Sequence, residues 1–204
     1  MVQSPSPLRS STYADVTALI LAGGASTRMG VDKAFLAYEG TPLIARVHAV
    51  LAPLFAEVLI AAGAETPGRG PFPARTLYDA TPGLGPLAGL VAGLKAAETP
   101  WLFMVACDMP HLDPKVIARV VAERGPGVMA VVPESAGGLE SCHALYAKAA
   151  LPAIEAAMAE GERAPHRLFR RIATHIVPKA AIAALDPTFR SLANLNTPDD
   201  LTRV

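Results

Sequence analysis

The sequence has few aromatic residues and no excess of charge of either sign. Aromatic side chains make up 5% of its 204 residues, and 18 Lys and Arg residues balance 18 Asp and Glu residues. Proteins that bind long nucleic acids usually carry a basic excess, because phosphate neutralisation supplies much of the affinity, and base stacking needs aromatic rings. We therefore expect no nucleic acid partner, although a few local cations can still hold a small anionic ligand.

Long apolar stretches and paired cysteines are also missing. No segment reaches the roughly 18 consecutive apolar residues of a membrane helix, so no membrane association is expected. Cys107 and Cys142 form no CxxC pair, which argues against a structural disulfide and favours a cytoplasmic location. Residues 1–14 open with Ser and Pro and lack an apolar run, which is typical of a disordered tail rather than a signal peptide.

Short apolar runs alternate with longer helical patterns along the rest of the chain, and 51% of all residues are hydrophobic. This alternation predicts a single α/β domain over residues 15–204, with a mainly parallel sheet between two helical layers in a Rossmann-like arrangement. The expected strands are 16–21, 57–61, 75–78, 101–107, 128–132 and 142–146. The expected helices are 41–51, 86–97, 113–123, 149–160 and 165–173. The pairs Thr41-Pro42 and Asp113-Pro114 favour helix starts.

The segment 21–33, LAGGASTRMGVDK, directly follows the first expected strand. Open α/β sheets bind ligands beyond such strand ends, and small residues with consecutive backbone amides can form an anion-binding concavity. Arg28 offers a planar donor fork for phosphate oxygens, and Lys33 offers a compact point charge. A turn whose glycines serve only positive φ is the alternative interpretation. The dinucleotide pattern GxGxxG and the Walker pattern GxxxxGK[ST] are both absent.

Two further motifs place polar groups near helix and strand ends. Asp79 precedes Gly85-Pro86-Leu87-Ala88-Gly89, where a glycine turn and a first-turn proline lead into a helix N-terminus suited to polar ligand groups. Asp108 follows the apolar strand 101–107, a place where a carboxylate can hold a magnesium ion that bridges to substrate phosphates. Turn geometry for the first motif and loop capping for the second are the alternatives.

The C-terminal third carries two more polar features. Asn194 and Asn196 are spaced to face the same side of an extended segment, and residues 197–200 (TPDD) are typical of a helix start. The expected helix 165–173 and the residues before it carry a basic face made of Arg163, His166, Arg167, Arg170 and Arg171. We interpret this face as solvated, and a docking surface for an anionic acceptor or a recipient enzyme is the alternative.

The segment 21–33 resembles the nucleotide-binding loop of the molybdenum cofactor guanylyltransferases, a MobA-like nucleotidyltransferase family. Its LAGG opening, RMG centre and DK ending match that loop, and the segments GPLAG, CDMP and NLNTP resemble others of the family over residues 16–201. Where the family often has an Asn after the second strand, this chain reads AAGA at 61–64. The resemblance implies a nucleotidyltransferase fold and nucleotide-binding residues at Leu21, Ala22, Gly23, Gly24, Lys33, Asp79, Gly85, Gly89, Asp108, Asn194 and Asn196.

By this resemblance, the chain transfers GMP from GTP to the terminal phosphate of molybdenum-bound molybdopterin and releases pyrophosphate. Arg28 and Lys33 would hold the triphosphate, and Asp108 would hold Mg²⁺. We expect direct in-line attack, because alignment and charge neutralisation suffice and no nucleophile set demands a covalent intermediate. We expect a monomer, with molybdoenzyme apoproteins or other cofactor-biosynthesis proteins as partners.

Three alternatives to this function stay open. Two are enzymes that share the loop chemistry, a molybdopterin cytidylyltransferase and a sugar-phosphate nucleotidyltransferase. The third is a non-catalytic chaperone that binds nucleotide or pterin and releases no pyrophosphate.

Overall fold

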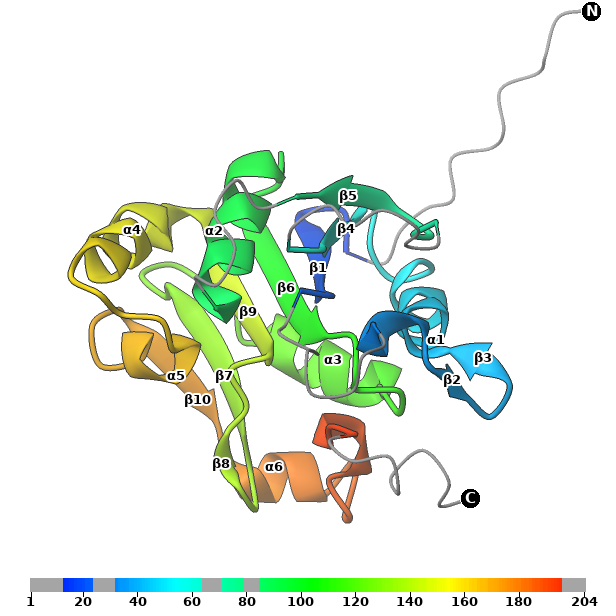
Figure 1. Ribbon diagram of the computed structural model, residues 1–204. Helices are drawn as coiled ribbons and strands as arrows, with labels where there is room; N and C mark the ends of the chain where they lie inside the picture. The colour runs from blue at the N-terminus through cyan, green and yellow to red at the C-terminus, as the bar shows by residue number, and fades with distance from the viewer. Residues whose placement is uncertain (1–12, 24–31, 64–70, 79–84, 196–204) are drawn as a thin grey trace, which may run out of the picture.

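The chain folds into three layers, in which helices cover both faces of a central β-sheet (Figure 1). The computed structural model describes residues 13–23, 32–63, 71–78 and 85–195. The prediction of an α/β fold with a mainly parallel sheet is confirmed. In the part of the chain that the structure describes, no helix combines the length and apolar character needed to span a bilayer.

The main sheet has the strand order β10-β7-β9-β6-β1-β4-β5, and β8 pairs with β7 beside this path. The strands are β1 (Val16–Leu21), β4 (Val58–Ala61), β5 (Arg75–Leu77), β6 (Trp101–Ala106), β7 (Ala130–Ser135), β8 (Gly138–Leu139), β9 (His143–Ala147) and β10 (Thr174–Val177). Strand β9 runs antiparallel to both β6 and β7, whereas β1 is parallel to β4 and β6. The order reverses between β1 and β6, and ligands of open α/β sheets bind at such a switch point.

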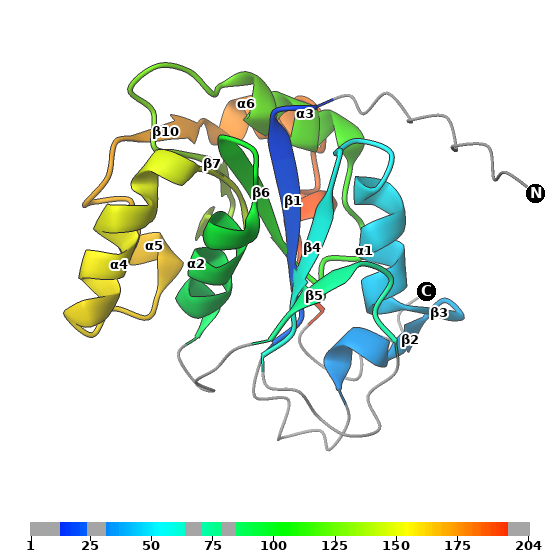
Figure 2. The same cartoon turned by 90° about the horizontal axis from the view of Figure 1, so that it is seen from above.

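Two groups of helices form the outer layers (Figure 2). One face is covered by α2 (Pro86–Ala96), α4 (Leu151–Ala159) and α5 (Pro165–Leu168), and the other by α1 (Leu43–Leu51), α3 (Pro114–Ala122) and α6 (Lys179–Ala183). Short 3-10 turns are η2 (Lys33–Phe35), η3 (Lys148–Ala150) and η4 (Arg190–Leu192). Each layer therefore has its own apolar core against the sheet.

Strand β6 shows why the centre of the sheet reads as one continuous apolar run. Phe103 and Val105 belong to the core under α1 and α3, while Leu102 and Met104 belong to the core under α2 and α4. All four are fully buried. A strand covered on both faces needs apolar residues at every position, so periodicity of two is lost. The expected central strand is confirmed and ends one residue earlier, at Ala106.

The helix predicted to start at Thr41-Pro42 starts later than expected. Thr41 and Pro42 form β3 (Thr41–Pro42), which pairs antiparallel with β2 (Ala37–Tyr38), and α1 begins at Leu43 without a side-chain cap. Glu39 and Gly40 between the two strands both have positive φ, 48° and 75°. Two consecutive residues with positive φ favour a tight hairpin, so the local turn overrides the capping signal. The Asp113 cap is confirmed, since its side chain accepts from the Lys115 N–H at 2.7 Å.

The helix predicted over 165–173 is also wrong in extent. Helix α5 ends at Leu168, and β10 and α6, which we did not predict, follow it. The run THIV before Pro178 is rich in β-branched residues, which favours a strand over a helix. Strand β10 lies at the edge of the sheet, and its apolar residue Ile176 is 46% exposed. Apolar residues in this strand therefore do not mark a buried face, and the sequence pattern for a strand is weak.

Among the residues of the expected tail, Tyr13 belongs to the fold, since its N–H donates to Leu54 O at 3.0 Å.

Candidate active site

The candidate site lies where the neighbouring parallel strands β1 and β6 end. Leu21 pairs in register with Ala106, and the Cys107 N–H donates to Leu21 O at 3.0 Å. Ala22 and Gly23 therefore continue beside Cys107 and Asp108 at the carboxyl edge of the sheet. The sequence predicted that each of the two motifs follows the end of its strand.

Lys33 and Asp108 form an ion pair across this edge. The Lys33 Nζ donates to Asp108 Oδ2 at 2.6 Å, although the two residues are 75 positions apart. Their side chains are 22% and 16% exposed, so the pair is accessible to a ligand and only partly screened by water. Asp108 Oδ1 is buried and has no hydrogen-bond donor within the described part of the chain. A buried anionic oxygen without a donor loses solvation, and a bound cation would compensate for that loss.

A pocket of about 160 Å³ surrounds this ion pair. It is lined by Leu21, Ala22, Gly23, Asp32, Lys33, Ala34, Pro86, Ala106, Cys107, Asp108 and Cys142. The lining thus joins the loop after β1, the turn η2, the N-terminus of α2 and the end of β6. Gly24, which the resemblance assigns to the nucleotide, and Arg28, which was expected to hold the triphosphate, both lie outside the described residues.

The second motif positions the start of α2 at the pocket. Gly85 is the N-cap and has φ 74° and ψ −171°, a conformation that is strained for any residue with a Cβ. Pro86 follows at the first helical position and reaches the pocket wall. The free amides and positive dipole end of an α-helix attract anions, so α2 is placed to support a phosphate or another polar ligand group. Asp79 lies outside the described residues.

Gly89 has a packing role that the sequence did not reveal. A Cβ at this position would lie 2.7 Å from Leu21 Cδ2 and 3.2 Å from Ala61 Cβ. Gly89 is therefore the point where α2 packs closely on β1 and β4. Gly89 does not line the pocket itself, but it lies against Leu21, which does.

A second close approach joins the loops after β1 and β4. A Cβ on Gly23 would lie 2.7 Å from the Gly63 backbone nitrogen. Gly63 itself has φ 67°, so both positions favour glycine for different reasons.

The asparagine segment reaches the site through the backbone. The Leu195 N–H donates to Asp108 O at 2.9 Å, and the buried Leu195 side chain packs with Tyr38 and Leu43. Asn194 is therefore held next to the end of β6, and its side chain is exposed. Asn196 and the expected helix start at 197–200 lie outside the described residues.

The two pocket thiols are poor nucleophiles. Burial, with the adjacent Asp108 carboxylate, raises the pKa of Cys107 to about 12. Burial also raises the pKa of Cys142 to about 11. Because only the thiolate attacks effectively, both groups stay inert near neutral pH. Both cysteines are free, which agrees with the expectation that they form no disulfide.

Sequence reasoning identified Lys33 and Asp108 but missed three polar or sulfur-bearing neighbours in the lining, Asp32, Cys107 and Cys142. Asp32 stands inside the loop motif, next to Lys33, so its position in the sequence was a usable signal. Cys142 precedes β9, and its place in the pocket depends on the antiparallel pairing of β9 with β6, which leaves no local signal.

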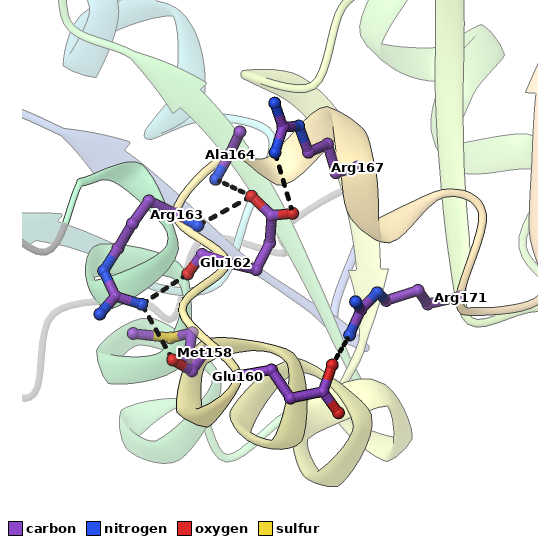
Figure 3. A network of polar contacts seen from close by, with 7 residues as sticks. All are labelled: Met158, Glu160, Glu162, Arg163, Ala164, Arg167 and Arg171. Carbon is purple, nitrogen blue, oxygen red and sulfur yellow. Dashed lines mark hydrogen bonds and ion pairs between the residues drawn. The ribbon is translucent and has the colours of Figure 1, made fainter.

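The basic segment forms a network of polar contacts with the end of α4 and the residues that follow it (Figure 3). The Arg163 guanidinium donates to Met158 O, in the last turn of α4, at 2.9 Å and to Glu162 O, beyond the end of the helix, at 2.7 Å. Arg171 pairs with Glu160 at 2.5 Å, and Arg167 lies 3.8 Å from Glu162. These partners favour the interpretation of a solvated, internally paired surface over that of a docking site.

Comparisons with known proteins identify relatives of this chain. A molybdenum cofactor guanylyltransferase of Pseudomonas putida is 36% identical over 90% of this chain and 94% of its own. A probable molybdenum cofactor guanylyltransferase of Chloroflexus aggregans is 38% identical over 93% of each chain. The crystal structure of molybdopterin-guanine dinucleotide biosynthesis protein A from Archaeoglobus fulgidus superposes with a TM-score of 0.76 at 25% identity, covering 92% of this chain and 95% of that one.

More distant structures share the fold. A 2-C-methyl-D-erythritol 4-phosphate cytidylyltransferase from Thermus thermophilus superposes with a TM-score of 0.64 at 20% identity, over 90% of this chain and 94% of that one. The family model for the MobA-like NTP transferase domain matches residues 18–176, from β1 into β10. The match spans most of the chain and includes Lys33 and Asp108, so this chain belongs to the MobA-like NTP transferase family.

Proposed function

We propose that this chain transfers GMP from GTP to the terminal phosphate of molybdenum-bound molybdopterin, with Mg²⁺ as cofactor and pyrophosphate as the second product. The observation that carries the proposal is the Lys33–Asp108 pair at the switch point of a nucleotidyltransferase fold. A cation for phosphate oxygens and a carboxylate for a metal stand together there, and metal-assisted phosphoryl chemistry needs both.

The residues at the site fit a magnesium ion. Asp108 offers a buried oxygen without a donor, and Mg²⁺ typically takes one or two protein carboxylates and completes its shell with phosphate and water oxygens. No group of three or more His, Cys, Asp or Glu that could hold a metal occurs among the described residues. When bound, the ion would neutralise charge on the triphosphate. Asp108 is the residue that would hold it.

The chain's own groups would then align two anionic reactants. Lys33, with Arg28 from the loop, would hold the triphosphate oxygens, and the N-terminus of α2 would support the nucleotide from the other wall. The acceptor phosphate would attack the α-phosphorus in line, and pyrophosphate would leave. The protonated Cys107 and Cys142 support direct transfer without a covalent enzyme intermediate.

The choice of GTP and of the molybdopterin acceptor rests on the names of the relatives. Asp79, Gly85 and Asn194 are proposed to bind the nucleotide or lie on the acceptor side, as the resemblance implies. We place the reaction in the cytoplasm, where thiols such as Cys107 and Cys142 stay reduced. A monomer acting with molybdoenzyme apoproteins or other cofactor-biosynthesis proteins remains part of the proposal.

The test measures Mg²⁺-dependent pyrophosphate release with GTP, and separately with CTP, in the presence of molybdenum-loaded molybdopterin. Release with GTP alone supports the proposal, and release with CTP alone would make the chain a cytidylyltransferase. Nucleotide binding without release, with an acceptor that a control enzyme accepts, would favour a carrier.

Variants connect the activity to the site. Lys33→Ala and Asp108→Asn should each lower kcat by about 100-fold or more, because each removes a charge that stabilises the transition state. Lys95→Ala is the matched control, since Lys95 also forms a 2.6 Å ion pair, with Glu155, on the exposed surface of α2 and α4. Full activity in folded Lys33→Ala and Asp108→Asn variants would contradict the proposed roles.

A further inference from the structure

The position of the Lys33 ammonium group depends on the backbone that carries it. A lysine side chain has four rotatable bonds, so it reaches a fixed point only when its Cα is fixed and its partner holds its end. Asp108 supplies the partner at 2.6 Å. The backbone of η2 must supply the rest, because Lys33 is the first residue of that turn.

Asp32 fixes the start of η2. It is the N-cap of the turn, with extended backbone at φ −67° and ψ 113°, and its Oδ1 accepts from the Ala34 N–H at 3.1 Å. The Asp32 carbonyl also accepts from the Phe35 N–H at 3.0 Å. One residue therefore holds two of the first amides of η2, in the way that Asp and Asn side chains cap helices.

The other end of η2 is anchored in the core. Ala34 is fully buried, and the Phe35 ring lies against the Phe72 ring with centroids 5.1 Å apart. The Leu43 N–H donates to Leu36 O at 3.0 Å, which joins the turn to the start of α1. With its C-terminal side fixed by packing, the direction of Lys33 depends on how the N-terminal side is held.

Asp32 also belongs to the lining of the pocket that holds Lys33 and Asp108. We propose that Asp32 is a positioning residue that acts through Lys33: its carboxylate caps η2 and thereby aims the Lys33 ammonium at the triphosphate. This inference rests on the proposed function of the site. The competing role is direct, in which the negative charge of Asp32 acts on the metal or the nucleotide.

Substitution by Asn separates these two roles. Asn keeps the side-chain oxygen that accepts from Ala34 N–H and caps helices as well as Asp does, but it carries no charge. We expect Asp32→Asn to keep GTP affinity and kcat within about threefold of the wild type. We expect Asp32→Ala to lower kcat by about 10- to 100-fold, since a displacement of about 1 Å in a catalytic group has effects of this size.

A double-mutant cycle then tests whether Asp32 acts through Lys33. GTP affinity in the presence of Mg²⁺ is measured by calorimetry for the wild type, Asp32→Ala, Lys33→Ala and the double variant. Asp32→Ala should weaken binding in the wild-type background and have little further effect once Lys33 is absent. Asp113→Ala is the control, because Asp113 makes the same kind of cap on α3, and its loss should leave GTP affinity unchanged.

Two results would overturn the proposal. An equal loss of GTP affinity from Asp32→Ala with and without Lys33 would show that Asp32 acts directly on the ligand. A loss from Asp32→Asn as large as that from Asp32→Ala would show that charge, not capping, matters. If the wild type released no pyrophosphate, the proposed function would fail, but the affinity cycle would still decide the role of Asp32.

Discussion

Replacing Lys33 with Met should tighten the binding of a divalent metal to the nucleotide-free protein. In the structure the Lys33 ammonium occupies Asp108 Oδ2 at 2.6 Å, so a metal that arrives alone meets a neutralised carboxylate. Removing the ammonium frees the carboxylate and removes a repelling charge. Met keeps most of the apolar stem and so limits the packing change.

The size of the effect follows from the ion pair. Two unit charges at 2.6 Å interact by about 6 kcal/mol at an effective dielectric constant of about 20. The side chains are 22% and 16% exposed, so water offsets part of this energy, and a charged hydrogen bond contributes about 1.5–3 kcal/mol net. At about 1.4 kcal/mol per factor of ten, metal affinity should rise by about 10- to 100-fold.

The assay follows the electron paramagnetic resonance signal of free Mn²⁺ during titration with protein, near neutral pH and without nucleotide. The double variant Lys33→Met/Asp108→Asn should not show the increased Mn²⁺ affinity of Lys33→Met, and Lys95→Met should bind Mn²⁺ as the wild type does. With GTP present, Lys33→Met should bind Mn²⁺ more weakly than the wild type, because Lys33 then contributes to holding the triphosphate. Equal or weaker Mn²⁺ binding by nucleotide-free Lys33→Met would refute the competition between lysine and metal for Asp108.

Three further predictions concern the scaffold. Gly89→Ala should lower the free energy of unfolding by about 1–2 kcal/mol, because its methyl group would meet Leu21 2.7 Å away; chemical denaturation measures this, and unchanged stability would contradict the close packing. Gly85→Ala should cost about 1–3 kcal/mol through strain at φ 74°, with weaker GTP binding by calorimetry because the start of α2 shifts. His143→Leu should reduce the loss of unfolding free energy at acidic pH, which urea unfolding at a series of pH values measures.

The fold was predictable where one local signal dominated. Strand β1 was predicted with its observed bounds, since its apolar run stands between polar segments, and Asp113 caps α3 as its pairing with Pro114 indicated. The hairpin at Glu39-Gly40 was missed because Thr41-Pro42 gives a competing local signal. The direction of β9 could not be predicted, because an antiparallel strand between β6 and β7 depends on pairing with distant residues.

The site also has features that the sequence predicts and features that it does not. Lys33 and Asp108 could be singled out because Lys33 belongs to the charged loop motif that follows β1 and Asp108 follows the end of β6, where both charges can reach a ligand. Their direct contact could not, since it depends on where η2 directs the lysine stem. The packing of Gly89 against Leu21 was likewise invisible, because a glycine that permits close approach looks the same in sequence as one that binds a ligand.

The acid sensitivity expected from His143 follows from its burial. Its side chain is fully buried, and neither ring nitrogen has a hydrogen-bond partner within the described part of the chain; the ring meets Phe103 edge-on, with centroids 5.1 Å apart. Burial lowers the pKa of His143 from 6.5 to about 4. Between these two pH values the unfolded chain binds the proton and the folded chain does not, so the free energy of unfolding falls as the pH drops from 6.5 towards 4. Above pH 6.5 His143 is neutral in both states and causes no loss of stability.

The full effect of this depressed pKa amounts to about 3 kcal/mol, at about 1.4 kcal/mol per pKa unit. Leu cannot take up a proton and leaves no unpaired polar atom, so His143→Leu should be at least as stable as the wild type near neutral pH. The difference between the two unfolding free energies isolates His143 from carboxylates such as Asp15, whose side-chain hydrogen bond with Arg124 lowers its pKa below 3.8 and moves its own effect to more acidic conditions. If both proteins lost stability in parallel over this range, His143 would have to gain a proton acceptor or water in the folded state, and the apolar surroundings that the structure gives it would be incorrect.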